Sequence, residues 1–377
     1  MQGVAGRESL RVSPQMAAHV TKPILCFYIG YADNLSPGAT AGAVLYGAEL
    51  ATVSLAEQLA QFYDVHVFGP SLTNSNHNHV RYRSSHELDA FQLSNVVDVM
   101  IISRYVHYFL EFTNRARATY IWLHDVRVHP YWRAMVLPQK AKHLLENQMS
   151  NIDGLIVLSP WHKEEVLAHY DVDPAKVFVI GNAIEPERFT PHPIDAKVPN
   201  RFIYTSAPNR GLDVLIDCFH EVRRAVPDAE LYVYRGREGF TDELLATMES
   251  CAYVHFRGAT DNRVLAREFL KSDIWFYPTS WPETYCISAL EAQMAGCACV
   301  ASDLAALHTT VGDRGVLVPG APDTDDFKAR AIAEVVNLLN DPTRKHALQE
   351  RGRAWAAQQT WQARAIEWLT VLGSATR

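Results

Sequence analysis

The stretch DIWFYPTSWPETYCISALEAQMAGCACVASD, residues 273–303, contains two short apolar runs on either side of a longer segment. The runs DIWFYPT (273–279) and CACVASD (297–303) are almost continuously apolar, which is typical of strands buried on both faces of a parallel sheet. The segment between them has the apolar spacing of a buried helix. A strand, a helix and a strand in this order predict one unit of a doubly wound α/β fold.

The same alternation continues on both sides of this stretch. Six apolar runs come before the proline-rich segment EPERFTPHPIDAKVPN (185–200), and six come after it. The twelve runs are PILCFYIG (23–30), DVHVFG (64–69), DVMIIS (98–103), YIWLHD (120–125), GLIVLS (154–159), VFVIGN (177–182), RFIYTSA (201–207), AELYVYRG (229–236), YVHFRGA (253–259), DIWFYPT, CACVASD and GVLVPG (315–320). Because open parallel sheets bind ligands beyond the carboxyl ends of their strands, two such units in series predict two Rossmann-like domains that face each other across a cleft.

The length of 377 residues also favours two domains, since one hydrophobic core seldom serves a chain of this size. We expect a flexible leader at residues 1–20, a first Rossmann-like domain at 21–190 and a second at 191–350. Residues 351–377 are expected to form a C-terminal helix that packs back toward the first domain.

Composition excludes several classes of function. The net charge of -7 argues against general electrostatic attraction to nucleic acid or to anionic membranes. No apolar run approaches the length of about 18 residues that a transmembrane helix needs. The six cysteines show no paired spacing, so reduced thiols in a cytoplasmic protein are expected. His77 and His79 lie in a polar loop that we interpret as a solvated turn and not as a metal site.

Neither of the common nucleotide-binding glycine motifs is present, but two places are suited to a phosphate. No G-x-G-x-x-G follows a strand, and no P-loop sequence occurs. The helix after Glu283 is expected to begin near Thr284, which would leave unpaired N–H groups from Thr284 to Ile287. The strand at 201–207 leads into PNRG (208–211), where Arg210 would meet a diphosphate at the mouth of the cleft.

Two carboxylates in the opening stretch need an explanation. Glu283 lies at the carboxyl end of a strand, from which it can point into the cleft. Glu291 lies inside the apolar part of the helix, where an unpaired charge is unfavourable. Carboxylates accept hydrogen bonds from vicinal hydroxyls, so both residues suit a ligand with sugar rings. In the alternative interpretation, Glu283 is an N-terminal helix charge and Glu291 pairs with a nearby arginine.

Several segments together resemble the retaining, nucleotide-sugar-dependent glycosyltransferases of the GT-B fold, the large family 4. PETYCISALEAQMAG (282–296) is similar to the E-x7-E segment of that family, and YGAELATVSLAEQLAQFYDVHVFG (46–69) to its opening helix. GLIVLSPWHKEEVL (154–167) and YDVDPAKVFVIGNAIEPERFTP (170–191) are similar to its run into the interdomain linker. APNRGLDVLIDCF (207–219) resembles its Lys-Gly segment. The resemblance extends from about Lys22 to the C-terminus.

The resemblance implies a retaining glycosyltransferase that moves a sugar from a nucleoside-diphosphate sugar to an acceptor hydroxyl. Residues 21–190 would form the acceptor domain and residues 191–350 the donor domain. The acceptor would be a glycan, a lipid-linked molecule or a small molecule. The sequence does not select among UDP, GDP and ADP as the nucleotide.

The resemblance also implies roles for single residues. Glu283 would meet hydroxyls of the transferred sugar, and Arg210 would neutralise the diphosphate in place of the family's lysine. His124 matches a histidine that reaches the sugar from the first domain, and Gly47 would let the first loop approach the donor phosphate or the acceptor. The donor-binding set would be Glu291, on the ribose hydroxyls, with Thr284, Tyr285, Cys286, Ile287, Asn209, Gly258 and Thr260.

The chain departs from the family pattern at two places. YTSAPNR (204–210) lacks the family's second cation, for which Arg235 or Arg237 is a candidate substitute. Tyr46 replaces the first glycine of the opening turn. No Asp-x-Asp motif stands at a suitable strand end, so we expect neither a metal nor a cofactor beyond the donor. Two alternatives stay open: a non-catalytic sugar- or nucleotide-binding module, and a sugar-nucleotide epimerase.

Overall fold

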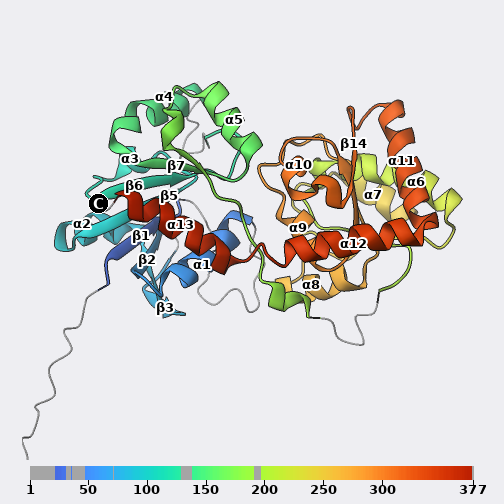
Figure 1. Cartoon of the computed structure of the whole chain (residues 1–377), viewed down its shortest axis with the longest axis horizontal. Helices are drawn as coiled ribbons and strands as arrows, with labels where there is room; N and C mark the ends of the chain where they lie inside the picture. Colours follow the sequence, from blue (N-terminus) through green and yellow to red (C-terminus); the bar gives the residue numbers. More distant parts are fainter. Residues whose placement is uncertain are drawn as a thin grey trace, which may run out of the picture.

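The computed structural model describes residues 22–30, 35, 47–70, 72–128, 138–190 and 197–375. Two separate β-sheets, each packed between helices, occupy the two halves of the chain (Figure 1). Among the described residues, all strand pairs are parallel except one at an edge of the first sheet. The predicted α/β fold with two doubly wound, Rossmann-like units is therefore confirmed.

The first sheet has eight strands in the order β3-β4-β2-β1-β5-β6-β7-β8. Its strands are β1 (Ile24–Tyr28), β2 (Asp64–Gly69), β3 (Ser75–His77), β4 (Val80–Ser84), β5 (Val97–Ser103), β6 (Ala118–Trp122), β7 (Gly154–Val157) and β8 (Val177–Val179). The helices of this half are α1 (Gly47–Leu59), α2 (Leu88–Ser94), α3 (Tyr108–Glu111), α4 (Pro138–Gln148) and α5 (Pro160–His169).

The second sheet has six strands in the order β11-β10-β9-β12-β13-β14. They are β9 (Arg201–Tyr204), β10 (Glu230–Val233), β11 (Val254–Phe256), β12 (Ile274–Tyr277), β13 (Ala298–Ser302) and β14 (Val316–Val318). The helices are α6 (Leu212–Ala225), α7 (Asp242–Ser250), α8 (Asn262–Lys271), α9 (Ile287–Met294), α10 (Leu307–Thr310), α11 (Asp325–Asn340) and α12 (Pro342–Ala356), and α13 (Trp361–Ala375) follows.

In both sheets the first strand lies in the middle of the sheet. The next strands are added toward one edge, and the later strands are added on the other side of the first strand. The reversal falls between β1 and β5 in the first sheet and between β9 and β12 in the second. The crevice beyond the carboxyl ends of the strands at such a reversal is where doubly wound sheets bind their ligands. The fold therefore places the segments after Tyr204 and Tyr277 at the expected ligand site of the second sheet.

The solvated turn predicted around His77 and His79 is present, and it belongs to a β-hairpin. His77 ends strand β3, which pairs antiparallel with β4 across a two-residue turn. The turn residues Asn78 and His79 have φ angles of 46° and 65°. Two successive residues with positive φ are typical of the tight hairpin turn whose twist matches the flanking strands.

The chain crosses between the two halves twice, and the crossings lie side by side. The first follows β8, and the second joins α12 to α13 (Figure 1). Ile184 N–H donates to the carbonyl of Gln359 at 3.0 Å, and Ile184 forms a parallel bridge with Thr360. Arg364 Nε donates to the carbonyl of Asn182 at 3.2 Å. Each crossing therefore stabilises the position of the other.

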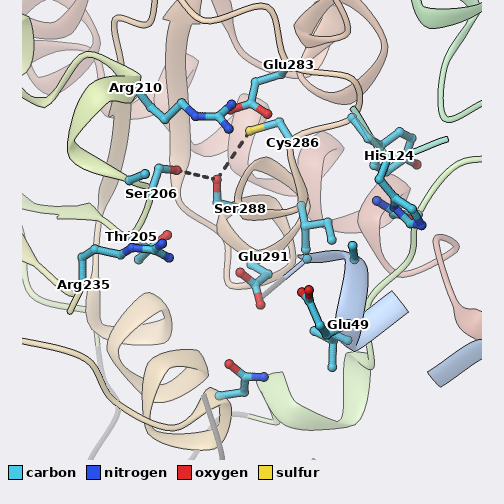
Figure 2. A pocket seen from close by; sticks show the side chains of 18 of the residues that line it. Glu49, His124, Thr205, Ser206, Arg210, Arg235, Glu283, Cys286, Ser288 and Glu291 are labelled. Atoms are coloured by element: carbon cyan, nitrogen blue, oxygen red, sulfur yellow. Dashed lines mark hydrogen bonds and ion pairs between the residues drawn. The ribbon is translucent and has the colours of Figure 1, made fainter. Parts of the chain in front are cut away.

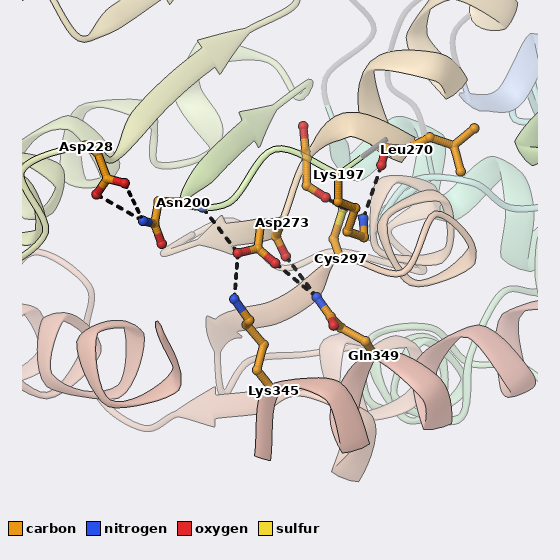
Figure 3. A network of polar contacts seen from close by, with 9 residues as sticks. Lys197, Asn200, Asp228, Leu270, Asp273, Cys297, Lys345 and Gln349 are labelled. Atoms are coloured by element: carbon orange, nitrogen blue, oxygen red, sulfur yellow. Dashed lines mark hydrogen bonds and ion pairs between the residues drawn. The ribbon is translucent and has the colours of Figure 1, made fainter. Parts of the chain in front are cut away.

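Helix α12 is fixed to the second half by a buried carboxylate. Asp273 accepts hydrogen bonds from Lys345 Nζ at 2.7 Å and from Gln349 Nε2 at 3.1 Å (Figure 3). The backbone N–H of Asn200 donates to the same carboxylate at 3.2 Å. Asp273 directly precedes β12, so this network secures the edge of the sheet opposite to the carboxyl ends of the strands.

Helix α13 returns to the first half and packs on its core. Trp368 is fully buried, and its ring centroid lies 5.1 Å from that of Trp122 in β6. The backbone carbonyl of Val371 accepts from Tyr120 Oη at 3.2 Å. Within the part of the chain that the structure describes, no helix is long and apolar enough to cross a membrane.

Replacing Trp368 with alanine tests the docking of α13. Loss of a fully buried tryptophan leaves a cavity, so we expect Trp368→Ala to lower the free energy of unfolding by about 3–5 kcal/mol. Ile366 lies on the same helix and is 66% exposed, and Ile366→Ala is expected to change it by no more than about 0.5 kcal/mol. Urea denaturation measures both. Equal unfolding midpoints for the two variants would contradict the packing described here.

Candidate active site

A cavity of about 530 Å³ lies between the two sheets, at the carboxyl ends of their strands. The first half contributes the start of α1 and residues that follow β5, β6 and β7. The second half contributes residues that follow β9, β10, β11 and β12, together with the start of α9. The volume is within the range of about 300–1,000 Å³ that is usual for small-molecule sites.

The start of α9 forms one wall of the cavity. The helix begins at Ile287 and not near Thr284, because Cys286 adopts left-handed angles of φ 62° and ψ 77° that no right-handed helix accommodates. The predicted start near Thr284 was therefore wrong by three residues. Ala289 N–H donates to the Cys286 carbonyl at 3.1 Å, whereas the N–H groups of Ile287 and Ser288 have no partner among the described residues.

Hydroxyl and thiol groups surround this helix start. Ser288 Oγ lies 3.5 Å from Ser206 Oγ and 3.4 Å from Cys286 Sγ (Figure 2). Burial raises the pKa of the Cys286 thiol, which therefore remains protonated at neutral pH. From the first half, Gly47 at the start of α1 comes so close that a Cβ atom there would lie 3.4 Å from Ile287 Cδ1. Two helix N-termini, each with a partial positive charge, thus approach one another in the cavity.

Arg210 and Glu283 form an ion pair at one end of the cavity. Arg210 Nη1 donates to Glu283 Oε1 at 3.1 Å, and Tyr277 Oη donates to the same oxygen at 2.7 Å. Burial, and next the charge of Glu283, raise the pKa of Tyr277, so its hydroxyl remains a donor. The Arg210 guanidinium lies over the Trp281 ring, 3.9 Å from its centroid. These contacts fix the guanidinium but use only part of its five donors.

Glu291 lies one turn into α9, on the side that lines the cavity (Figure 2). Its Oε1 atom is 3.3 Å from Arg188 Nη2. Among the described residues, no group donates to Oε2. Burial raises the pKa of the Glu291 carboxyl, and Arg188 opposes that rise. The pairing with an arginine that we considered as an alternative is therefore present, and the carboxylate also lines the cavity.

His124 comes from the first half and is held uncharged. Burial, and next the nearby charge of Arg104, lower its pKa to about 3. Its Nε2 atom is enclosed and has no hydrogen-bond partner among the described residues. The ring packs on Trp122, and the His124 carbonyl accepts from Thr284 Oγ1 at 2.8 Å. That hydrogen bond connects the two halves directly beside the cavity.

A second group of charged residues lines the first-half wall. Arg104 follows β5 with a left-handed φ of 67°, and its Nε and Nη2 atoms donate to the two oxygens of Asp125 at 2.8 and 2.9 Å. Arg104 Nη1 also lies 3.8 Å from Glu49 Oε1 in α1. Burial raises the pKa of the Glu49 carboxyl, and the charge of Arg104 opposes this rise. This wall offers carboxylate acceptors and a guanidinium toward the space opposite α9.

Arg235 is the candidate second cation that the cavity contains. It follows β10 and lines the cavity near Thr205 and Ser206 (Figure 2). Arg237, the other candidate, is exposed and is not part of the lining. Of the two candidates for the missing second cation, only Arg235 lies in the cavity lining.

The structure brings ten of the twelve predicted site residues into the lining of this one cavity. They are Gly47, His124, Arg210, Thr260, Glu283, Thr284, Tyr285, Cys286, Ile287 and Glu291. Asn209 is exposed and lies outside the lining, as does Gly258. The roles assigned to all twelve stay predictions. Tyr46, the departure from the opening turn, lies outside the described residues.

Several lining residues were not among the predicted ones. Arg104 directly follows β5, and Asp125 lies in the segment that leaves β6, so a search of every strand end for charged residues would have found both. Asn182, whose Oδ1 atom is buried without a partner among the described residues, gave no such signal.

Residues 200–341 match the family model described as Glycosyl transferases group 1. This match covers most of the second domain. Phosphatidyl-myo-inositol mannosyltransferase from Mycobacterium tuberculosis is 29% identical over 178 residues, which cover 45% of this chain and 46% of that relative. D-inositol 3-phosphate glycosyltransferase from Corynebacterium diphtheriae is 28% identical over 264 residues, which cover 63% and 60% of the two chains. The chain thus spans about half the length of the curated relatives that it matches.

Solved structures agree on the fold of the whole chain. Sucrose-phosphate synthase from Thermosynechococcus elongatus aligns with a TM-score of 0.76 at 16% identity, over 94% of this chain and 99% of that one. Anabaena HepE, solved with UDP and glucose, aligns with a TM-score of 0.68 at 15% identity, over 93% and 99% of the two chains. The predicted GT-B fold is thereby confirmed.

The charge state of His124 can be measured directly. Because burial disfavours the imidazolium, we expect its ring resonances to show no titration between about pH 5 and 8. The unfolded chain takes up this proton near pH 6.5, so His124 costs native stability only as the pH falls below that value. Histidine-selective NMR, with His124→Gln for assignment, measures the titration. A midpoint near pH 6.5 would contradict the enclosed geometry.

Proposed function

We propose that the protein is a glycosyltransferase that moves a sugar from a nucleoside-diphosphate sugar to an acceptor hydroxyl, with retention of the anomeric configuration and without a metal ion. The observation that carries this proposal is the convergence, in one interdomain cavity, of the start of α9, the Arg210–Glu283 pair and Glu291. The match of the second domain to the group 1 family model supports it, as do the UDP and glucose bound by HepE.

The proposal assigns each part of the donor to a different group. The diphosphate lies against the N–H groups of Ile287 and Ser288, because these are unpaired donors at the positive end of a helix dipole. The ribose hydroxyls donate to the open oxygen of Glu291. The transferred sugar lies between Glu283 and His124, which line the cavity from opposite halves.

When the donor is bound, Arg210 interacts with two anions, the Glu283 carboxylate and the diphosphate. It already balances Glu283, and a diphosphate adds negative charge beside it. A guanidinium carries five donors in a planar fork, so it can bind a phosphate oxygen with one edge and keep or exchange its contact with Glu283. The described cations of the lining are Arg104, Arg210 and Arg235, against the carboxylates of Glu49, Asp125, Glu283 and Glu291. The phosphate is therefore bound by local geometry and not by a generally positive cavity.

Transfer breaks the bond between the anomeric carbon and the diphosphate oxygen, and the bonding electrons leave with the phosphate. Arg210 and the start of α9 stabilise the charge that develops there, which lowers the barrier because both are already in place. The acceptor hydroxyl then bonds to the anomeric carbon from the same face, and its proton passes to the leaving phosphate oxygen. The acceptor approaches from the wall formed by Glu49, Arg104 and Asp125.

The first test separates binding from transfer. We expect Glu291→Gln to weaken the binding of the preferred nucleoside diphosphate, among UDP, GDP and ADP, by about 10- to 100-fold, since a hydrogen bond to a charged group contributes about 1.5–3 kcal/mol. Glu283→Gln should leave this affinity nearly unchanged and abolish transfer. Isothermal titration and a donor-consumption assay measure the two effects, and Glu334→Gln, in α11 and outside the cavity lining, is the control.

Three results would contradict this assignment. Unchanged nucleotide affinity in Glu291→Gln would remove the role given to the ribose contact. Tight donor binding without transfer or hydrolysis would favour a binding module. Isomerised donor in the absence of an acceptor would identify an epimerase.

The second test addresses stereochemistry and metal dependence. We expect the product to have the same anomeric configuration as the donor, and we expect activity to persist after dialysis against EDTA, because Arg210 and the α9 start supply the positive charge. NMR of the anomeric proton and an assay before and after chelation measure these properties. An inverted product, or activity that returns only with a divalent cation, would contradict the proposed chemistry.

A further inference from the structure

Arg188 lies behind the cavity wall, in a short 3-10 helix at Pro186–Phe189 that follows the first interdomain crossing. Its side chain is only 8% exposed, so the guanidinium is held within the protein and not at its surface. Three separate groups surround it. Nη2 lies 3.3 Å from Glu291 Oε1, Nη1 donates to the carbonyl of Asn262 at 3.4 Å, and Nε lies 3.4 Å from Glu185 Oε2.

This arrangement leaves the two oxygens of Glu291 in different situations. Oε1 faces Arg188. No described residue donates to Oε2, and Glu291 lines the cavity. A buried carboxylate is strongly disfavoured unless a counterion and hydrogen bonds compensate for the lost water. Arg188 supplies that compensation from the side away from the cavity.

We propose that Arg188 is a positioning residue for the nucleotide: it holds Glu291 ionised and oriented so that the open carboxylate oxygen can accept the ribose hydroxyls. This inference rests on the proposed function, because it takes Glu291 to be a nucleotide contact. Arg188 is not among the residues that line the cavity, and it acts on the nucleotide only through Glu291.

Through Arg188, Glu291 is also connected to the first half of the molecule. Glu185, the second carboxylate on Arg188, accepts at its Oε1 atom from Ser54 Oγ of α1 at 3.4 Å. Helix α1 is the element that begins at Gly47 in the cavity. The Arg188 guanidinium therefore lies between Glu291 of the second half and Glu185, which contacts the first half.

Substitution of Arg188 distinguishes a positioning role from a purely structural one. We expect Arg188→Gln to raise the Kd of the nucleoside diphosphate by about 10- to 100-fold, and to raise the KM for the donor more than it lowers kcat. Arg188→Lys keeps the charge without the fork and should restore part of the affinity. The double variant Arg188→Gln/Glu291→Gln should bind no more weakly than Glu291→Gln alone, because both changes remove the same contact.

The matched control is Arg314→Gln. Arg314 is also a mostly buried arginine that contacts α9, where its Nε donates to Gln293 Oε1 at 3.3 Å, and its guanidinium lies over the Trp355 ring. It does not line the cavity. This variant is expected to lower the melting temperature as much as Arg188→Gln does, with the nucleotide Kd unchanged.

The pH dependence of nucleotide binding provides a second measurement. A change that only destabilises the fold would not shift the pH at which affinity falls. The described charges that act on the Glu291 carboxyl are Arg188, which lowers its pKa, and Glu185, which raises it, while Glu49 faces it across the cavity (Figure 2). Removal of Arg188 raises this pKa further. Because only the ionised carboxylate accepts both ribose hydroxyls, affinity should fall with decreasing pH at a higher pH in Arg188→Gln than in the parent.

The outcomes are distinct. If the parent binds a nucleoside diphosphate and Arg188→Gln binds it equally well with the same pH profile, the positioning role is wrong and the proposed function stands. Equal losses of affinity in Arg188→Gln and Arg314→Gln would assign Arg188 a structural role only. If the parent binds none of UDP, GDP and ADP, the proposed function fails, and this inference fails with it.

Discussion

The left-handed conformation of Cys286 is the constraint on which the rest of the site depends. A non-glycine residue in this region costs on the order of 1 kcal/mol or more, and it prevents α9 from beginning earlier. The chain therefore leaves β12 through an irregular loop that keeps Glu283 outside the helix and beside Arg210. It then enters the helix at a point where the first N–H groups and Glu291 face the same cavity. A helix that started at Thr284 would instead have bonded the N–H groups of Ile287 and Ser288 to carbonyls of its own first turn.

The same loop fixes how the two domains meet. Thr284 donates its hydroxyl to the carbonyl of His124, and the Tyr285 ring packs so closely on the first crossing that a Cβ atom at Gly181 would lie 2.5 Å from it. Tyr285 Oη accepts from Arg364 of α13 at 3.3 Å, and Arg364 also bonds to the carbonyl of Asn182. One segment thus carries several groups that line the cavity, the contact to His124 and the contacts to Gly181 and Arg364. The geometry of the cavity and the relative placement of the domains are consequently a single structural property.

Sequence patterns were sufficient for most of the fold and for much of the site. Each of the twelve apolar runs overlaps a strand, because burial on both faces leaves a signal that needs no tertiary information, whereas β3 and β4, at one edge of the first sheet, were not predicted. The cavity residues were found where they closely follow a strand, as Arg210 and Glu283 do. The start of α9 was missed because Pro282 followed by Glu283 and Thr284 is an ordinary helix-start pattern, and a left-handed cysteine leaves no trace in composition. Arg188 could not be assigned because its contact with Glu291 spans 103 residues along the chain.

The most direct test of this site is a crystal structure of the chain with a bound nucleoside-diphosphate sugar. The expected result is a diphosphate within hydrogen-bonding distance of the Ile287 and Ser288 N–H groups and of the Arg210 guanidinium, with the ribose hydroxyls on Glu291. A donor bound outside the interdomain cavity, or one whose diphosphate points away from the start of α9, would contradict the central claim that this helix start and Arg210 together hold the leaving group.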